Sequence, residues 1–134
     1  MTRTIIAYVA TLIIFGALDA VWLSQSAELL YRPIIGAILA PEPRMVPAVL
    51  FYLIYIAGLL YFAVLPGLAG AGWQGSLLKG ALFGFFCYAT YDLTNQATLA
   101  VWSSRITIAD MLWGSFVSGV GATGGCLVTR FLKG

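Results

Sequence analysis

The sequence predicts an all-α integral membrane protein, a bundle of four transmembrane helices forming a single domain over residues 1–134. Of the 134 residues, 61% are hydrophobic and only 9% are charged, whereas a soluble domain has about 25% charged residues. Four apolar stretches are long enough to cross a hydrocarbon core about 30 Å thick, which takes about 20 residues of helix. Proline and glycine stand at the ends of one of these stretches, as expected of helix boundaries.

The first apolar stretch covers residues 4–24. It follows Arg3, as the apolar part of a signal peptide would, but Asp19–Trp22 stands where a small-residue cleavage site is expected. We therefore expect an uncleaved signal anchor. In the following connection, 28–45, the apolar piece 34–39 is too short to span the bilayer, which predicts an interfacial or partly re-entrant segment.

The second stretch, 46–65, has Pro47 in its first turn and Pro66 just after its last. The third and fourth stretches cover 76–102 and 108–131. Because the connection between these two is short, we expect them to form an antiparallel hairpin. An even number of spans would place both termini on one side of the membrane.

Charge gives a weak indication of which side that is. The count of basic residues is four on the side of the termini (Arg3, Lys79, Arg130, Lys133) against three on the other (Arg32, Arg44, Arg105), which favours cytoplasmic termini. The basic residues are scattered singly and the net charge is +2, so binding to nucleic acid is not expected.

Small residues four apart mark close helix packing in the last two spans. They include Gly80 and Gly84 in the third span, and Gly114, Gly121 and Gly125 in the fourth. Such spacing lets helix backbones approach in lipid, where no hydrophobic force drives association. Packing within the bundle is the first interpretation, and a homo-oligomer interface is the second.

Metal and cofactor chemistry has little support in the sequence. There is no histidine, and the two cysteines, Cys87 and Cys126, lie in separate apolar stretches. We therefore expect no zinc or haem site, no other cofactor and no disulfide, with both thiols acting as small buried hydrophobes.

Three intramembrane aspartates carry most of the functional information. At a helical rise of 1.5 Å per residue, Asp19 lies about 22 Å from the start of the first span and Asp92 about 24 Å from the start of the third. The fourth span runs the opposite way, and Asp110 lies about 30 Å from Arg130 near its far end. All three are thus predicted at one level, in the leaflet opposite the termini. Because an ionised aspartate there costs about 3 kcal/mol, each should face protein or water.

Polar and aromatic side chains share this level. We predict a ligand-binding site formed by Asp19, Trp22, Tyr88, Tyr91, Asp92, Thr94, Asn95, Thr98, Asp110 and Trp113. Arginines in the loops above could neutralise part of its charge.

Structural alternatives exist for several of these residues. Thr107 and Asp110 have the spacing of a helix capping box, and Trp22 and Trp113 could belong to an interfacial aromatic belt. Asp19 and Asp92 could form structural hydrogen bonds between helices.

Three segments carry a family resemblance. Leu18-Asp19-x-x-Trp22-Leu23, Tyr91-Asp92-Leu93-Thr94-Asn95-x-Ala97-Thr98 and Asp110-x-x-Trp113-Gly114 resemble DUF2177, a bacterial family of small four-helix membrane proteins of unknown function. The resemblance extends over essentially the whole chain. It implies a location in the bacterial inner membrane and importance of these motifs, and it supplies no activity.

Three functions fit these observations. The first is binding of a small polar or cationic ligand or a lipid headgroup, with proton-linked transport as an extension, because carboxylates and aromatic faces both attract cations. The second is a membrane enzyme that uses Asp19, Asp92 or Tyr91 for acid–base chemistry on a lipid. The third is a non-catalytic subunit of a larger membrane complex.

Overall fold

The computed structural model describes residues 1–133, and in that range it contains helices and loops only. Three continuous helical stretches are long and apolar enough to cross a membrane, namely 2–38, 45–98 and 104–133. The all-helical membrane class is therefore confirmed. Four separate helices are not confirmed in the predicted form, because helical structure continues through residues 60–69 and is interrupted only by a tight turn at Gly70 and Gly72.

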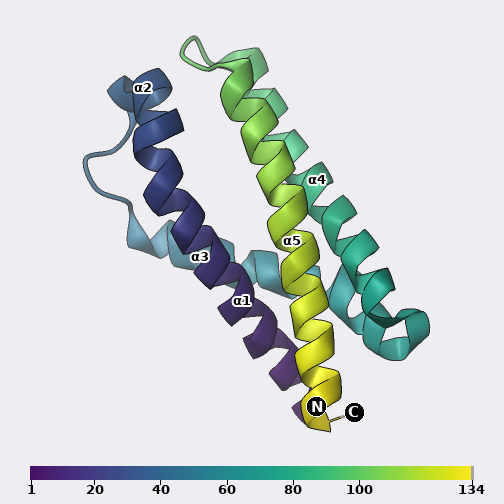
Figure 1. The fold of residues 1–134 in the computed structure, drawn as a ribbon. Coiled ribbons are helices and arrows are strands. Elements are labelled where there is room, and N and C mark those ends of the chain that lie inside the picture. The colour runs from purple at the N-terminus through teal and green to yellow at the C-terminus, as the bar shows by residue number, and fades with distance from the viewer. Residues whose placement is uncertain (134) are drawn as a thin grey trace.

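The first stretch contains four elements in sequence: α1 (Thr2–Ser26), η1 (Ala27–Tyr31), α2 (Arg32–Ile35) and η2 (Gly36–Ile38). The segment predicted to lie apart at the interface is thus an irregular helical extension of α1. Pro33 is tolerated there because it occupies the first turn of α2, where no backbone N–H is needed. In Figure 1 this extension lies at the end of the molecule remote from both termini.

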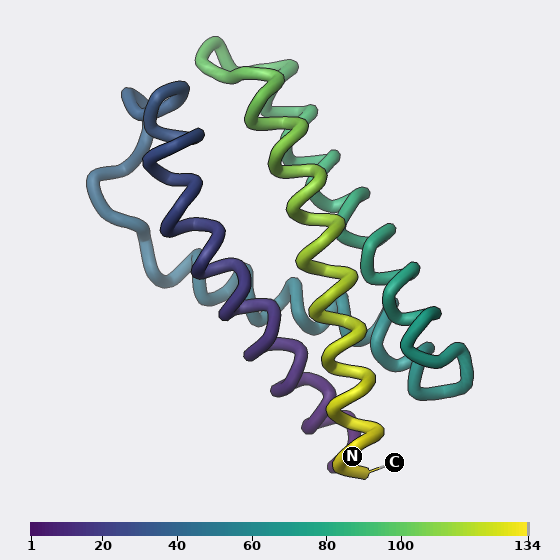
Figure 2. The backbone as a smooth tube through the Cα atoms, viewed as in Figure 1, coloured from purple at the N-terminus to yellow at the C-terminus, as the bar shows by residue number. Residues whose placement is uncertain are grey.

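The second stretch contains α3 (Met45–Leu59), η3 (Leu60–Val64), η4 (Gly67–Ala71) and α4 (Gly72–Thr98). The backbone reverses direction near its middle, at Gly70 (φ 149°) and Gly72 (φ 76°), a conformation that residues with a Cβ rarely adopt. Figure 2 shows the resulting turn, after which α4 runs back alongside the last helix. The two arms of this stretch therefore point in different directions.

The last helix, α5 (Ser104–Lys133), lies between α4 and α1 (Figure 1). Towards α4, a Cβ on Gly80 would lie only 2.7 Å from the carbonyl oxygen of Ser118. Towards α1, a Cβ on Gly121 would lie 3.5 Å from the Cβ of Phe15.

All five glycines considered as an oligomer interface are in contact with other helices of the same chain: Gly80, Gly84, Gly114, Gly121 and Gly125. These glycines therefore pack within the bundle, as the first interpretation predicts. A homo-oligomer would have to use another surface.

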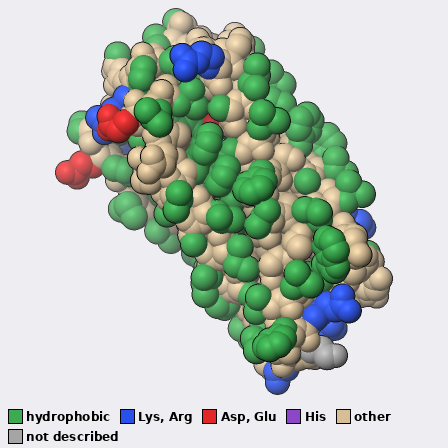
Figure 3. Space-filling model, in the orientation of Figure 1, with side chains coloured by type: hydrophobic (Ala, Val, Ile, Leu, Met, Phe, Trp, Pro, Cys, Tyr) green, Lys and Arg blue, Asp and Glu red, His purple; other side chains and the backbone are tan. Residues whose placement is uncertain are grey.

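The outer surface has the distribution expected in lipid. Figure 3 shows hydrophobic side chains over most of one face, with charged side chains mainly towards its two ends. Large apolar side chains such as Ile54 and Phe86 are more than half exposed. Inside, Phe15, Ile56 and Val117 form part of a fully buried apolar core. Apolar groups thus cover the exterior as well as the interior, which a soluble protein of this size would not tolerate.

Candidate functional site

Asp19 lies where α1, α3 and α5 meet, and the protein satisfies both of its oxygens. The Tyr52 hydroxyl donates a hydrogen bond to Oδ2, and the Trp113 indole N–H donates to Oδ1 at 3.0 Å. The carboxyl group is almost completely buried. Because the carboxylate lies on α1 and its two donors lie on α3 and α5, it acts as a structural link between three helices.

A pair of stacked tryptophans connects Asp19 with a second carboxyl group. The rings of Trp22 and Trp113 lie 4.8 Å apart at an interplanar angle of 7°. The Trp22 N–H points to the Tyr31 hydroxyl oxygen at 3.4 Å, and that hydroxyl donates to Oδ1 of Asp110. Both indoles thus take part in this interhelical network.

Asp92 differs from the other two aspartates. It is 0% exposed, and neither carboxyl oxygen has a hydrogen-bond partner within residues 1–133. The Asp110 carboxyl lies close enough to share a proton with it, but no hydroxyl, amide or indole donor within residues 1–133 reaches it. A buried charged group in this position is costly unless something neutralises it.

No basic side chain in residues 1–133 performs that neutralisation. Within this range the ion pair formed is that between Arg32 and Glu28, at 2.8 Å and largely exposed. None of the loop arginines expected above the site, Arg32, Arg44 and Arg105, forms an ion pair with an aspartate in these residues, although Arg32 lines a hollow together with Asp110. In this range, the side-chain hydrogen bonds to Asp19 and Asp110 come from neutral hydroxyl and indole donors.

A hydrogen-bonded cap closes the site above Asp92. The Thr107 hydroxyl donates to the Gln96 side-chain oxygen at 2.7 Å and accepts from the Trp102 indole N–H at 2.9 Å. Helix α5 begins at Ser104, so Thr107 lies inside the helix, and the predicted capping box between Thr107 and Asp110 is not formed. Its hydroxyl instead ties the end of α4 to the start of α5.

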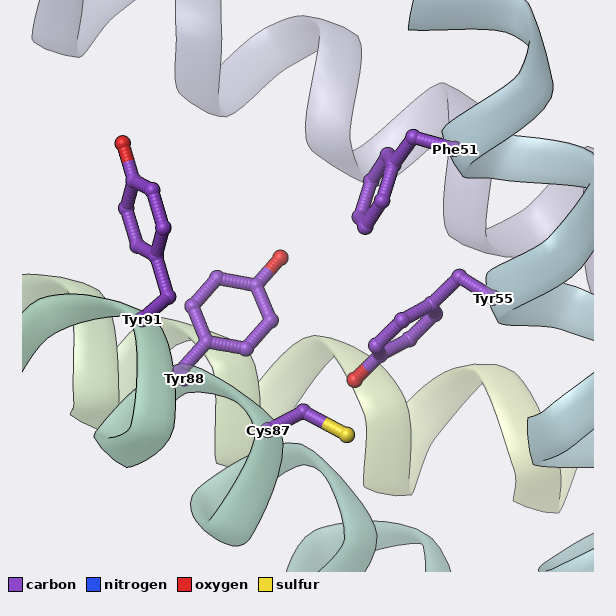
Figure 4. Close-up of a pocket in the computed structure, with 5 residues that line it drawn as sticks. All are labelled: Phe51, Tyr55, Cys87, Tyr88 and Tyr91. Atoms are coloured by element: carbon purple, nitrogen blue, oxygen red, sulfur yellow. The ribbon is translucent and has the colours of Figure 1, made fainter. Parts of the chain in front are cut away.

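Two hollows adjoin the cluster. The first, which we call the aromatic hollow, has a volume of about 260 Å³ and is lined by Phe51, Tyr55, Cys87, Tyr88 and Tyr91. Figure 4 shows the rings from α3 and α4 facing each other across it. The second, which we call the acidic hollow, has a volume of about 590 Å³ and includes Asp110, Tyr91, Tyr31, Arg32, Leu23 and Pro43 in its lining.

Comparison with known proteins places the chain in a family. The model of a family described as predicted membrane proteins, DUF2177, matches residues 4–127. The chain belongs to the DUF2177 family. No similar curated protein and no similar solved structure was found. The matched range contains all three aspartates, so the cluster lies within the part of this DUF2177 protein that defines the family.

Some residues predicted for the site lie outside the hydrogen-bonded cluster. In this DUF2177 protein the hydroxyls of Thr94 and Thr98 are exposed and donate to backbone carbonyls one turn earlier in α4. Asn95 is half-buried and lies beside the Tyr91 side chain. Tyr88 and Tyr91 line the hollows.

Two residues of the cluster were missed by the sequence reasoning, namely Tyr31 and Tyr52. Each donates to one aspartate. Tyr52 could have been found by the depth argument, since it lies about 9 Å from the start of the predicted span 46–65, close to the level of Asp19. Tyr31 gives no such signal, because its position depends on the irregular helical extension of α1.

Proposed function

We propose that this DUF2177 protein binds a small organic cation, such as an amine or a quaternary ammonium group, at its intramembrane acidic cluster. The single observation that carries the proposal is the completely buried carboxyl of Asp92, which no hydroxyl, indole or basic side chain within residues 1–133 reaches and which lies beside Asp110. A ligand cation would supply the counter-charge that the described chain lacks. The aromatic rings around the acidic hollow would add cation–π attraction.

The charge balance of the cluster supports a cation over an anion. Three carboxyl groups are present, and the nearest arginine that lines the acidic hollow, Arg32, is already paired with Glu28. Placing an anion beside Asp92 and Asp110 would add repulsion to an already unfavourable burial. A proton shared between Asp92 and Asp110 is the other way to reduce their repulsion, and this proton would leave when a cation binds.

Binding within one half of the membrane is better supported than passage through it. In the half near the termini, the buried hydroxyls of Thr11, Ser76 and Thr129 each donate to a backbone carbonyl of the protein. Trp22 and Trp113 also interrupt any chain of proton carriers, because an indole N–H donates and cannot accept. We therefore propose a binding site and not a proton-linked transporter in a single copy.

We further propose that the chain crosses the bacterial inner membrane four times with both termini in the cytoplasm. As a straight helix, residues 45–98 would be about 80 Å long, whereas the hydrocarbon core measures about 30 Å. The turn at Gly70 and Gly72 divides this stretch into arms that can each cross. Single cysteines at positions 2 and 103, in a background lacking Cys87 and Cys126, should react with an impermeant maleimide from opposite sides.

A second candidate is a membrane enzyme that uses acid–base chemistry. The observation that favours it is the closeness of Asp92 and Asp110, because two neighbouring carboxyl groups in different surroundings can act as acid and base. Asp19 is a poorer candidate since both of its oxygens already accept hydrogen bonds. Incubation of the purified protein with membrane lipids, followed by mass spectrometry, would reveal a change in lipid mass under this proposal only.

Titration calorimetry with tetramethylammonium on the protein in maltoside micelles tests the binding proposal. We expect saturable binding that weakens at least tenfold in Asp92→Asn, because the neutral amide removes the counter-charge without changing the shape. The matched control is Glu42→Gln, which neutralises an exposed carboxylate that lines neither hollow and should leave the affinity unchanged. Equal affinities in the wild type and Asp92→Asn, or no binding at all, would exclude the proposed site.

A further inference from the structure

The aromatic hollow and the acidic hollow adjoin each other. Tyr91 contributes to the lining of both. The aromatic hollow is formed almost entirely by apolar surface of α3 and α4, whereas the acidic hollow has Asp110 in its lining and lies beside the helical extension of α1. A molecule that occupied both would have its apolar part between α3 and α4 and its polar part near the membrane surface.

Tyr88 connects the aromatic hollow with the helix that carries Asp110. Its ring lines the aromatic hollow (Figure 4) and packs against Gly114 of α5. Gly114 lies one helical turn from Asp110, on the same face of α5. The aromatic hollow therefore ends beside the acidic cluster. Along the Tyr88 side chain, its wall changes from an apolar ring to a polar hydroxyl.

We propose that the ligand is a single-chain amphiphile with a cationic headgroup, a lipid amine or ammonium. Its headgroup lies in the acidic hollow against Asp110, with Asp92 behind, and the first part of its hydrocarbon chain occupies the aromatic hollow. This inference rests on the proposed function, because it takes the acidic cluster as a cation site and adds the part of the ligand that lies in the membrane.

The lining of the aromatic hollow favours a hydrocarbon chain. The Tyr55 hydroxyl is occupied by a hydrogen bond with Ser118 at 2.7 Å, so Tyr55 presents its ring to the hollow. Phe51 and the Cys87 thiol add further apolar surface. The two hollows together have the size of typical ligand pockets, which hold about 300–1,000 Å³. A small hydrophilic cation would occupy the acidic hollow alone.

A chain-length series tests the proposal, with tetramethylammonium, butyltrimethylammonium and octyltrimethylammonium as probes at one fixed micelle concentration. We expect octyltrimethylammonium to bind at least tenfold more tightly than tetramethylammonium. Asp92→Asn should weaken all three. If tetramethylammonium binds and the affinity does not rise with chain length, the amphiphile proposal is overturned while the cation site stands. If no probe binds, the proposed function fails, and this inference fails with it.

A pair of matched variants locates the hydrocarbon chain. Phe51→Trp places a larger side chain in the aromatic hollow and reduces its free volume. The variant should weaken the binding of octyltrimethylammonium about tenfold and leave the binding of tetramethylammonium unchanged. Phe86→Trp makes the same substitution on a residue of α4 that is 62% exposed and lines neither hollow, and it should change neither affinity. An equal effect of both variants on octyltrimethylammonium would contradict the assigned position.

Cys87 offers a measurement that does not depend on a bulky variant. In a Cys126→Ser background, its half-buried thiol is the target for a membrane-permeant maleimide. Octyltrimethylammonium at saturation should slow the labelling of Cys87 at least fivefold, whereas tetramethylammonium at saturation should not. Slowing by both probes to the same degree would show that the chain does not occupy the aromatic hollow.

Discussion

The two halves of the bundle use their buried polar groups in different ways. In the half near the termini, α4 and α5 meet at Gly80, and the buried hydroxyls of Thr11 and Thr129 donate to carbonyls of their own helices. In the opposite half, three buried carboxyls lie together: tyrosines and a tryptophan donate to Asp19 and Asp110, and no hydroxyl or indole donor within residues 1–133 reaches the Asp92 carboxyl. The buried hydroxyls of the first half thus have hydrogen-bond partners, whereas the second half contains a buried carboxyl without a donor.

This difference indicates a division of roles within a very small protein. Close contact of helix backbones gives stability in lipid through van der Waals packing. A buried unpaired carboxyl gives none and costs free energy, which proteins tolerate mainly at functional sites. Substitutions in the half near the termini should therefore act on stability, and substitutions at Asp92 should act on ligand binding.

The largest effect is expected for Gly80→Leu. Even a Cβ at this position would lie 2.7 Å from a backbone oxygen and 2.8 Å from the Cβ of Ala122, so a leucine would force α4 away from α5. We expect loss of monodisperse folded protein on size-exclusion chromatography. The matched control is Gly16→Leu in α1, where a Cβ meets nothing within 4 Å. Equal tolerance of both variants would contradict the assignment of tight packing to the half near the termini.

Asp19→Ala should have the next largest effect on stability. The substitution leaves the Tyr52 hydroxyl and the Trp113 indole N–H without their acceptor, and each unsatisfied buried donor costs about 1–3 kcal/mol. We expect the thermal midpoint in maltoside micelles to fall by several degrees. Tyr52→Phe removes one of the two bonds and should cause a smaller fall. An unchanged midpoint in Asp19→Ala would show that this carboxyl is not a structural link.

Asp92→Leu should change stability in the opposite direction. It removes a buried carboxyl that has no hydrogen bond and places an apolar group of similar size beside Asp110. Replacing buried charge by apolar residues is often neutral or stabilising by about 1–4 kcal/mol, so the thermal midpoint should stay the same or rise. Tetramethylammonium binding should be lost in the same sample. A destabilisation as large as that of Asp19→Ala would make Asp92 a structural residue.

Sequence reasoning located the level of the aspartates because depth in a helix depends only on the residue count and the rise per residue. It could not distinguish Asp19 from Asp92, since the difference lies in partners that other helices bring. Tyr52 and Trp113 reach Asp19 from α3 and α5, and no comparable donor reaches Asp92. The spacing within one helix contains no information on such contacts.

The connections were predicted less well than the helices. The apolar piece 34–39 was correctly judged too short to span, but its helical continuity with α1 follows from π-helical geometry at η1, which has no clear sequence signal. Likewise Pro66 was expected to end the second span, whereas the turn occurs at Gly70 and Gly72. Proline in the first turn of a helical segment does not require a break, while positive φ angles favour glycine.

The smallest effect is expected for Thr107→Val, which keeps the shape of the side chain and removes the hydroxyl that links Gln96 with Trp102. The loss should be about 1–2 kcal/mol, because two hydrogen bonds at about 1 kcal/mol each are broken at a partly exposed site. If the half that contains the three aspartates is an independent unit of low stability, hydrogen exchange should accelerate at residues 95–107 and stay unchanged around Gly80. Acceleration throughout α4 and α5 would instead mean that the two halves open together, and that the division of roles does not extend to dynamics.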